Sequence, residues 1–299
     1  MRIFLTGATG FIGTHIIPEL LGAGHQVLGL TRSDAGAATL TEAGVEPYRG
    51  TLEDPDSLAR GAAQADAVIH CAFDHDFSNF VANCEKDTRV IKAMGEALAG
   101  SDKPFVITSG TGVGLVEPGK PATEDAINLD HPNPRIGSER TGQAALDSGV
   151  KVIVVRLPQV HDTRRQGLIS PLAQIAREKG MSAYVGEGRN SWPAGHVRDV
   201  ARLYRLAVEQ GKAGERFNAV GEEGIQARDI AAALGRGLDV PVVSLTPEKA
   251  QEHFGWMGMF VGMDMPASSA WTQKRLGWTP KERGLIADLA EMDYSQFKL

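Results

Sequence analysis

Short apolar runs alternate with segments of helical periodicity along the first half of the chain. We predict strands at residues 3–5, 26–30, 45–50, 66–70, 104–107 and 151–157, with helical segments between them. Strands that alternate with helices in this way form a parallel sheet with both faces covered, so the predicted fold class is α/β, doubly wound. The alternation fades after about residue 160. We therefore expect a sheet domain over 1–160 and a smaller cap region over 161–299, with some elements returning to the sheet.

The first predicted strand runs directly into a glycine turn, Gly7-x-x-Gly10-x-x-Gly13, which a helical segment follows. Glycines let the main chain turn sharply and approach a ligand, and the N–H groups of a helix N-terminus attract a pyrophosphate. This pattern predicts a dinucleotide-binding turn of the Rossmann type, although a tight strand–helix turn without a ligand has the same pattern. The predicted contacts here are Gly7, Thr9, Gly10, Phe11, Ile12 and Gly13.

The second predicted strand ends at Thr31-Arg32-Ser33, about twenty positions after the glycine turn, where the residue that reads the ribose is expected. An acidic residue there would bind the ribose hydroxyls and repel a 2′-phosphate, whereas an arginine pairs with that phosphate. Arg32, helped by Thr31 or Ser33, therefore predicts NADP(H) rather than NAD(H) as the cofactor of the 1–160 domain. The alternative is an ordinary solvated loop arginine.

The glycine spacing resembles the amino terminus of the short-chain dehydrogenase/reductase superfamily, in its extended and atypical branches of NAD-dependent epimerase/dehydratase-like proteins. Residues 195–201 (GHVRDVA) and 276–280 (LGWTP) are similar to two further elements of that family, so the resemblance covers nearly the whole chain. Those branches include oxidoreductases, epimerases, dehydratases and NADP-binding sensors, so the resemblance implies a cofactor more firmly than a reaction. It also implies cofactor contacts at Leu52, Cys71, Ala72, Phe73, Ser109, Pro158 and Val160.

The catalytic pair of the superfamily, Tyr-x-x-x-Lys on one helix, is missing from this sequence. Matching the helix after the fifth strand places Arg135 at the tyrosine position and Glu139 at the lysine position. Arg135 cannot serve as the proton relay, because an arginine does not give up its proton at usable pH. His131-x-x-x-Arg135 keeps the same spacing and is similar to an atypical branch, so His131 could be the acid or base and Arg135 could stabilise an oxyanion or hold a carboxylate. The alternative is a surface-loop histidine and an arginine that starts a helix.

Hydroxyl groups follow the fifth predicted strand, in the segment Thr108-Ser109-Gly110-Thr111-Gly112. The resemblance places Gly110 where the family has a catalytic Ser or Thr. Ser109 and Thr111 flank that glycine, and Thr111 is the preferred candidate because it lies further toward the expected cleft. Their alternative role is turn formation, which Ser, Thr and Gly all favour.

The composition argues against several classes of function. Acidic and basic residues are mixed along the chain, with a formal net charge of -6, so no basic stripe for nucleic acid and no polybasic segment for a membrane is present. Cys71 and Cys84 do not make a disulfide framework, and no cluster of Cys and His has metal-site spacing. Without a signal-peptide core or a run of transmembrane length, we expect a cytoplasmic protein. The expected partners are a small-molecule substrate and, from the resemblance, a second copy in a homodimer.

We therefore predict an NADP(H)-dependent oxidoreductase of the atypical short-chain type, which transfers hydride to or from a small carbonyl or alcohol near Thr111, His131 and Arg135. Two alternatives remain. One is an epimerase or dehydratase that requires NADP without net consumption, and the other is a non-catalytic NADP(H) sensor, which the missing tyrosine and lysine favour. Trp192 offers a flat apolar surface for a ring or an acyl chain. The substrate-side candidates are Asn190, Trp192 and His196.

Overall fold

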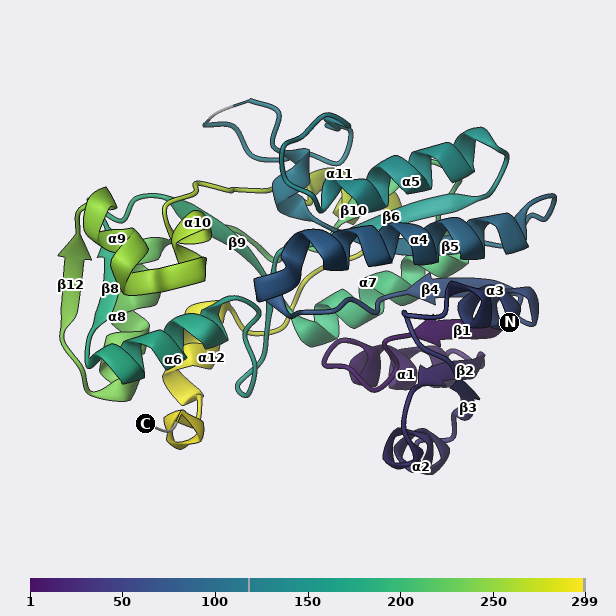
Figure 1. The fold of residues 1–299 in the computed structure, drawn as a ribbon, viewed down its shortest axis with the longest axis horizontal. Coiled ribbons are helices and arrows are strands. Elements are labelled where there is room, and N and C mark those ends of the chain that lie inside the picture. The colour runs from purple at the N-terminus through teal and green to yellow at the C-terminus, as the bar shows by residue number, and fades with distance from the viewer. Residues whose placement is uncertain (118, 298–299) are drawn as a thin grey trace.

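The main body of the protein is a seven-stranded parallel sheet (Figure 1). The computed structural model describes residues 1–117 and 119–297. The strand order is β10-β6-β5-β4-β1-β2-β3, so the chain starts in the middle of the sheet, moves out to β3 and then crosses to the other side with β4. The strands are β1 (Arg2–Thr6), β2 (Gln26–Thr31), β3 (Glu46–Arg49), β4 (Ala67–His70), β5 (Phe105–Gly110), β6 (Val152–Leu157) and β10 (Arg216–Asn218).

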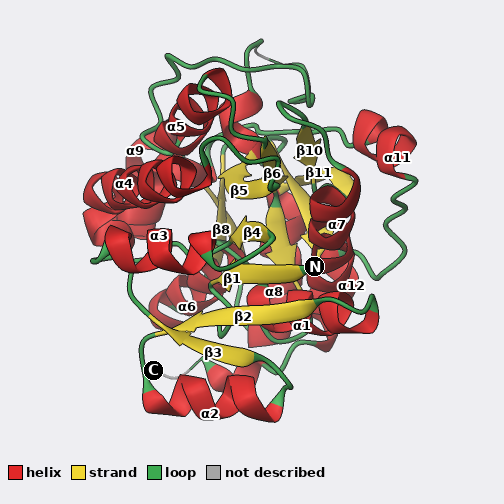
Figure 2. Ribbon diagram, turned by 90° about the vertical axis from the view of Figure 1, so that its right-hand side faces the viewer, coloured by secondary structure: helices red, strands yellow, loops and turns green. Residues whose placement is uncertain are grey.

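Helices cover both faces of this sheet (Figure 2). On one face, α1, α2 and α7 share an apolar cluster with Ile3 and Leu5 of β1. On the other face, α3, α4 and α5 pack around a second cluster that contains Phe4. Neighbouring residues of β1 therefore enter opposite clusters, as the two-residue period of a strand requires. The helices are α1 (Gly13–Gly22), α2 (Asp34–Glu42), α3 (Pro55–Ala63), α4 (Phe80–Leu98), α5 (Ile136–Asp147) and α7 (Val197–Gln210).

A smaller region of mixed structure lies at the end of the sheet to which the carboxyl ends of the strands point (Figure 1). It contains a three-stranded sheet in the order β11-β9-β7, a parallel pair β12-β8, and helices that share a separate apolar core. Its strands are β7 (Gln159–His161), β8 (Ser182–Val185), β9 (Ser191–His196), β11 (Glu222–Gln226) and β12 (Val242–Leu245). Its helices are α6 (Ile169–Lys179), α8 (Ala227–Leu238), α9 (Pro247–Phe254), α10 (Gly258–Val261) and α12 (Leu285–Glu291), and α11 (Ala270–Leu276) lies beside β10.

Short 3-10 helices complete the chain. They are η1 (Phe77–Asn79), η2 (Thr111–Gly114), η3 (Gly255–Met257) and η4 (Tyr294–Gln296). Within residues 1–117 and 119–297, none of the helices combines the length and the apolar character needed to cross a membrane.

The doubly wound α/β class predicted from the sequence is confirmed. All six predicted strands are present as β1 to β6. Five of them carry a buried run that the apolar pattern marks, whereas β3 is mostly exposed and follows the buried Val45. β10 was not predicted. Its three residues are too few to form a recognisable run, and their place beside β6 depends on a pairing across about sixty residues of chain. Two elements from the second half of the chain therefore belong to the large sheet domain: β10 pairs with β6, and α7 packs on one face of the sheet.

Candidate active site at the carboxyl edge of the sheet

The glycine turn after β1 is too tight for larger residues. Gly7 has a φ of 71°, and a Cβ added to it would lie 2.9 Å from the amide nitrogen of Ala72. A Cβ on Gly13 would lie 2.0 Å from the carbonyl oxygen of Gly7. α1 begins at Gly13 with no side-chain cap and no acidic residue in its first turn. The N–H groups of Thr14, His15 and Ile16 already donate to backbone carbonyls, so among the described residues the amides left to bind an anion here are those of Phe11, Ile12 and Gly13. The turn therefore fits the pyrophosphate of a dinucleotide. The other predicted contacts here, Thr9, Gly10, Phe11 and Ile12, are exposed or half-buried.

Arg32 extends from the end of β2 as an exposed cation. The neighbouring Arg49 is bound to Asp34, whereas no carboxylate pairs with Arg32 among the residues that the structure describes. Ser33 accepts a hydrogen bond from the backbone of α2 and so fixes the start of that helix. The charge beside the expected ribose is therefore free to meet a phosphate. Leu52, also predicted as a contact, is half-buried after β3 against the cluster of α3 and α4.

The ends of β1 and β4 are tied together next to the glycine turn. The hydroxyl oxygen of Thr6 accepts hydrogen bonds from the N–H groups of Cys71 and Ala72, both at 3.1 Å. Its own proton then goes to Nδ1 of His70, 2.7 Å away, so His70 is protonated on Nε2 and donates to Asp87 at 3.0 Å. The sequence shows no partner for His70, because Asp87 lies on α4. This bonding holds the backbone after β4 beside the turn, where the resemblance predicts cofactor contacts.

Arg135 is a fixed cation at the carboxyl edge of the sheet. It immediately precedes α5, and its guanidinium donates to the carboxylate of Asp87 at 2.6 Å, to the carbonyl of Thr108 at 2.8 Å and to the hydroxyl of Ser138. The guanidinium also lies 4.4 Å from the centre of the Phe73 ring. Burial raises the pKa of Asp87, but the Arg135 charge and hydrogen bonds from its neighbours outweigh it and hold that pKa below its ordinary value. Of the five guanidinium N–H groups, three have these partners and two remain for a ligand.

The lysine position of the superfamily is taken up by a buried ion pair. Glu139 and Arg156 are both inaccessible to solvent, and the guanidinium donates to the two carboxylate oxygens at 2.7 and 2.8 Å. Arg216 of β10 approaches the same carboxylate at 3.3 Å. Burial raises the pKa of Glu139, but the arginines and the hydrogen bonds lower it by more, so the group stays ionised. This carboxylate joins α5 to β6 and β10, and because it is enclosed it is not accessible as a catalytic group.

His131 lines a pocket to which the Arg135 side chain does not contribute. This pocket lies between α4 and α5 and is also lined by Glu85 and Arg89, and the His131 Nδ1 accepts a hydrogen bond from the backbone of Asn133. The pKa of His131 is lowered by burial alone, without a contribution from Arg135. Because α5 begins only at Ile136, the two residues do not share a helix face. The structure therefore does not bring this predicted pair together, and a catalytic role for His131 stays a prediction.

The two candidate hydroxyls differ in position. Thr111 begins η2, and its hydroxyl donates to the carbonyl of Leu157 at 3.4 Å, where β6 ends at the carboxyl edge. Ser109 is buried beside Glu139, whose pKa it helps to lower. Of the two, Thr111 is therefore the one placed along the edge. The remaining predicted contacts on this side, Pro158 and Val160, follow β6, and Val160 is buried in β7.

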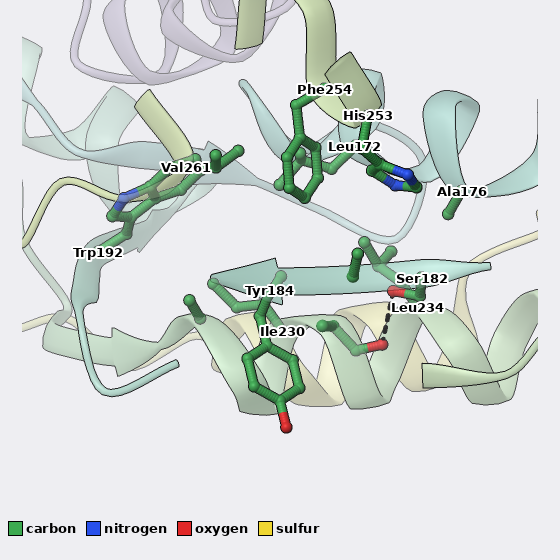
Figure 3. A pocket seen from close by; sticks show the side chains of 13 residues that line it. Leu172, Ala176, Ser182, Tyr184, Trp192, Ile230, Leu234, His253, Phe254 and Val261 are labelled. Carbon is green, nitrogen blue, oxygen red and sulfur yellow. Dashed lines mark hydrogen bonds between the residues drawn. The ribbon is translucent and has the colours of Figure 1, made fainter. Parts of the chain in front are cut away.

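Asn190 and Trp192 hold a distant segment of the C-terminal region in place. Asn190 donates to the carbonyls of Val261 and Met263, and Trp192 Nε1 donates to the carbonyl of Met263 at 3.1 Å. Trp192 also lines an apolar cavity between α6, β8, α8 and α9, into which the His253 ring extends (Figure 3). The volume of this cavity that the centre of a water molecule can occupy is only about 30 Å³. That is room for one or two waters and not for a substrate. These contacts indicate that Asn190 and Trp192 have a structural role in packing the C-terminal region.

A buried histidine–aspartate contact joins two elements of the small region, β7 and α12. His161 Nδ1 lies 2.7 Å from Asp288, and Nε2 of the predicted substrate residue His196 lies 3.7 Å from the same carboxylate oxygen. Burial lowers the pKa of His161 although Asp288 opposes this. No local pattern indicates the pair, because Asp288 follows 127 positions later. In the described part of the chain, no three His, Cys, Asp or Glu side chains are grouped so as to hold a metal ion.

Comparison with known proteins identifies the family. Residues 3–220 match the model of the NAD dependent epimerase/dehydratase family. The chain belongs to this family. It is 48% identical to an uncharacterized protein of Schizosaccharomyces pombe over 98% of this chain and 100% of that protein. It is 27% identical to a decarboxylating sterol-4-alpha-carboxylate 3-dehydrogenase of Dictyostelium discoideum, over 76% of this chain and 73% of that one.

A solved structure bears out the fold. The UDP-glucose 4-epimerase of Thermus thermophilus in complex with NAD superposes with a TM-score of 0.75 at 21% identity, over 99% of each chain. The family match and the 27% identical relative confirm the predicted membership of the extended short-chain dehydrogenase/reductase superfamily. An NAD(P) cofactor is typical of this family.

Proposed function

We propose that this family member is an NADP(H)-dependent oxidoreductase of the atypical short-chain type, acting on a small carbonyl or alcohol. The observation that carries the proposal is Arg135. Its guanidinium is fixed by Asp87 and Thr108 at the carboxyl edge of the sheet, with two N–H groups unshared. A cation held in this way stabilises negative charge on a carbonyl oxygen without having to reorganise during the reaction.

Each residue of the site has a distinct part in this scheme. The glycine turn binds the pyrophosphate, and Arg32 pairs with the 2′-phosphate. NADPH, when bound, would supply the hydride that reduces the carbonyl carbon. Arg135 donates hydrogen bonds to the carbonyl oxygen as it becomes an alkoxide. The proton that completes the alcohol cannot come from Arg135, so we assign its delivery to water through the Thr111 hydroxyl at the same edge.

Cofactor choice is tested by titrating the protein with NADPH and with NADH and following nucleotide fluorescence. We expect NADPH to bind more tightly. Arg32→Ala should weaken NADPH binding by roughly tenfold or more, because a charge-assisted contact is lost, and leave NADH binding unchanged. Tighter binding of NADH by the unaltered protein would refute the role of Arg32.

Turnover is tested by NADPH consumption against a panel of small aldehydes and ketones. Arg135→Lys keeps the charge beside Asp87 but loses the planar set of donors, so we expect kcat to fall by roughly a hundredfold with little change in the Kd for NADPH. His131→Ala is the matched comparison, because its ring faces the pocket between α4 and α5, and it should retain most of the activity. A large loss in His131→Ala and none in Arg135→Lys would reverse the assignment.

The same panel separates the alternatives. An epimerase or dehydratase would require the bound nucleotide but show no net consumption of NADPH. A sensor would bind NADPH and turn over none of the carbonyls. One observation favours the sensor. Glu139 occupies the position of the lysine in the usual proton relay, and it is buried in an ion pair with Arg156.

A further inference from the structure

The chain forms a tight hairpin between β7 and α6, at residues 161–166. The backbone N–H groups of Arg164 and Arg165 each donate to the Asp162 carboxylate at 2.7 Å. In return, the backbone N–H of Asp162 donates to the carbonyl of Arg165 at 2.9 Å. The Gln166 side chain, which is fully buried, closes the loop by donating to the carbonyl of Asp162 at 2.7 Å. The hairpin is anchored at its base by His161, through Asp288. The arginines at its tip are therefore presented from a firmly bonded backbone.

The second of these arginines reaches the glycine turn. The Arg165 guanidinium carbon lies 6.0 Å from the centre of the Phe11 ring, which follows Gly10 in that turn. The Arg165 charge also extends to the loop after β4. Burial and the Arg135 charge lower the pKa of His75 in that loop, and the Arg165 charge adds to the lowering. Arg165 thus lies beside the glycine turn, and its charge reaches the β4–α4 loop.

This cation has no partner of its own. The Arg165 side chain is exposed, and within residues 1–117 and 119–297 it has no carboxylate in ion-pair distance. The Asp162 carboxylate is engaged by the backbone of the hairpin. An arginine that is fixed at its backbone, uncompensated in charge and beside Phe11 of the glycine turn is placed to reach a phosphate group bound at that turn.

We propose that Arg165 is a cofactor-binding residue that closes over the pyrophosphate of the bound dinucleotide from the C-terminal region. This assignment rests on the proposed use of a dinucleotide and goes beyond it, because it gives a residue outside the glycine turn a part in holding the cofactor. The pyrophosphate is common to NADPH and NADH. Arg165 therefore contributes equally to the binding of both, whereas Arg32 serves only the 2′-phosphate.

The experiment compares three single variants, Arg165→Ala, Arg164→Ala and Arg32→Ala, by fluorescence titration with NADPH and with NADH at several salt concentrations. Arg164→Ala is the matched control, since it removes the same side chain from the neighbouring position of the same hairpin. We expect Arg165→Ala to raise Kd for NADPH and for NADH by the same factor, roughly three- to tenfold, and to make binding less sensitive to salt. Arg164→Ala should leave both constants close to those of the unaltered protein. Circular dichroism verifies that each variant is folded.

Each result decides the proposal. Unchanged Kd values in Arg165→Ala overturn it, and so does an equal loss in Arg164→Ala, which would mean a general effect of charge. A loss of NADPH binding alone in Arg165→Ala would assign the residue to the 2′-phosphate and also overturn it. If the unaltered protein binds neither nucleotide, the proposed function itself fails. That outcome differs from the failure of the Arg165 proposal alone, in which the unaltered protein binds a nucleotide tightly and Arg165→Ala binds it equally well.

Discussion

Replacing Glu139 by glutamine tests the departure of this chain from the superfamily pattern. Glu139→Gln keeps the shape of the side chain but leaves Arg156 buried without a counter-charge. Removing one member of a buried ion pair costs about 3–5 kcal/mol. With about 2.1 cal/mol/K of unfolding entropy per residue, a chain of 299 residues loses about 5–8 °C of Tm. Dinucleotide binding should be unaffected, because the carboxylate is inaccessible to solvent and is paired within the protein.

The assay is thermal unfolding followed by circular dichroism, together with NADPH titration. Glu291→Gln is the control, because its pair with Arg283 is exposed and should not move the midpoint measurably. The pKa of Glu139 is lowered in the folded protein, so its contribution is present above its ordinary value of 4.5 and is lost as pH falls. The difference in Tm between parent and variant should therefore be constant from pH 8 to pH 5 and shrink below about 4.5. A variant that melts within about 1 °C of the parent at pH 7 would refute the reasoning.

Further predictions concern the glycine turn and the cysteines. Gly13→Ala should raise Kd for NADPH and NADH by at least roughly tenfold, because its Cβ would meet the carbonyl of Gly7. Gly22→Ala is the control, since a Cβ there meets open space and should leave both constants unchanged. Unchanged binding in Gly13→Ala would contradict the geometry. Burial raises the pKa of the Cys71 and Cys84 thiols to about 11, so at pH 8 each should react with a disulfide reagent roughly a hundredfold more slowly than an ordinary thiol. Two thiols should react quickly in denaturant, and fast reaction of the native protein would show that the thiols are not buried.

Local patterns were sufficient to predict the backbone around the candidate site. The glycine turn was predicted because its conformation depends on residues within a few positions of one another. Arg32 was likewise selected by its distance to that turn; it is exposed and has no carboxylate partner among the described residues, and its role in binding a cofactor stays a prediction. Arg135 was predicted at the start of a helix, and it immediately precedes α5.

Pairs between distant elements could not be predicted in this way. The partner of His70 is Asp87 on α4, and the partner of Glu139 is Arg156 on the following strand. His131 and Arg135 were joined by spacing alone, but two intervening prolines and the late start of α5 separate their side chains. Trp192, interpreted as a substrate surface, is buried in the C-terminal core because β9 and the segment around Met263 come together there.

The position of β10 has a consequence for the order in which the molecule assembles. β6 ends at Leu157 and its outer neighbour begins at Arg216, so about sixty residues must be synthesised before the sheet is complete. At about 5–20 residues per second this takes roughly 3–12 s, during which a strand of buried valines has an open edge. Arg216 arrives on the same strand and reaches Glu139. A fragment that stops at residue 160 would therefore keep both the open edge and a carboxylate short of one partner, which favours association with other nascent chains.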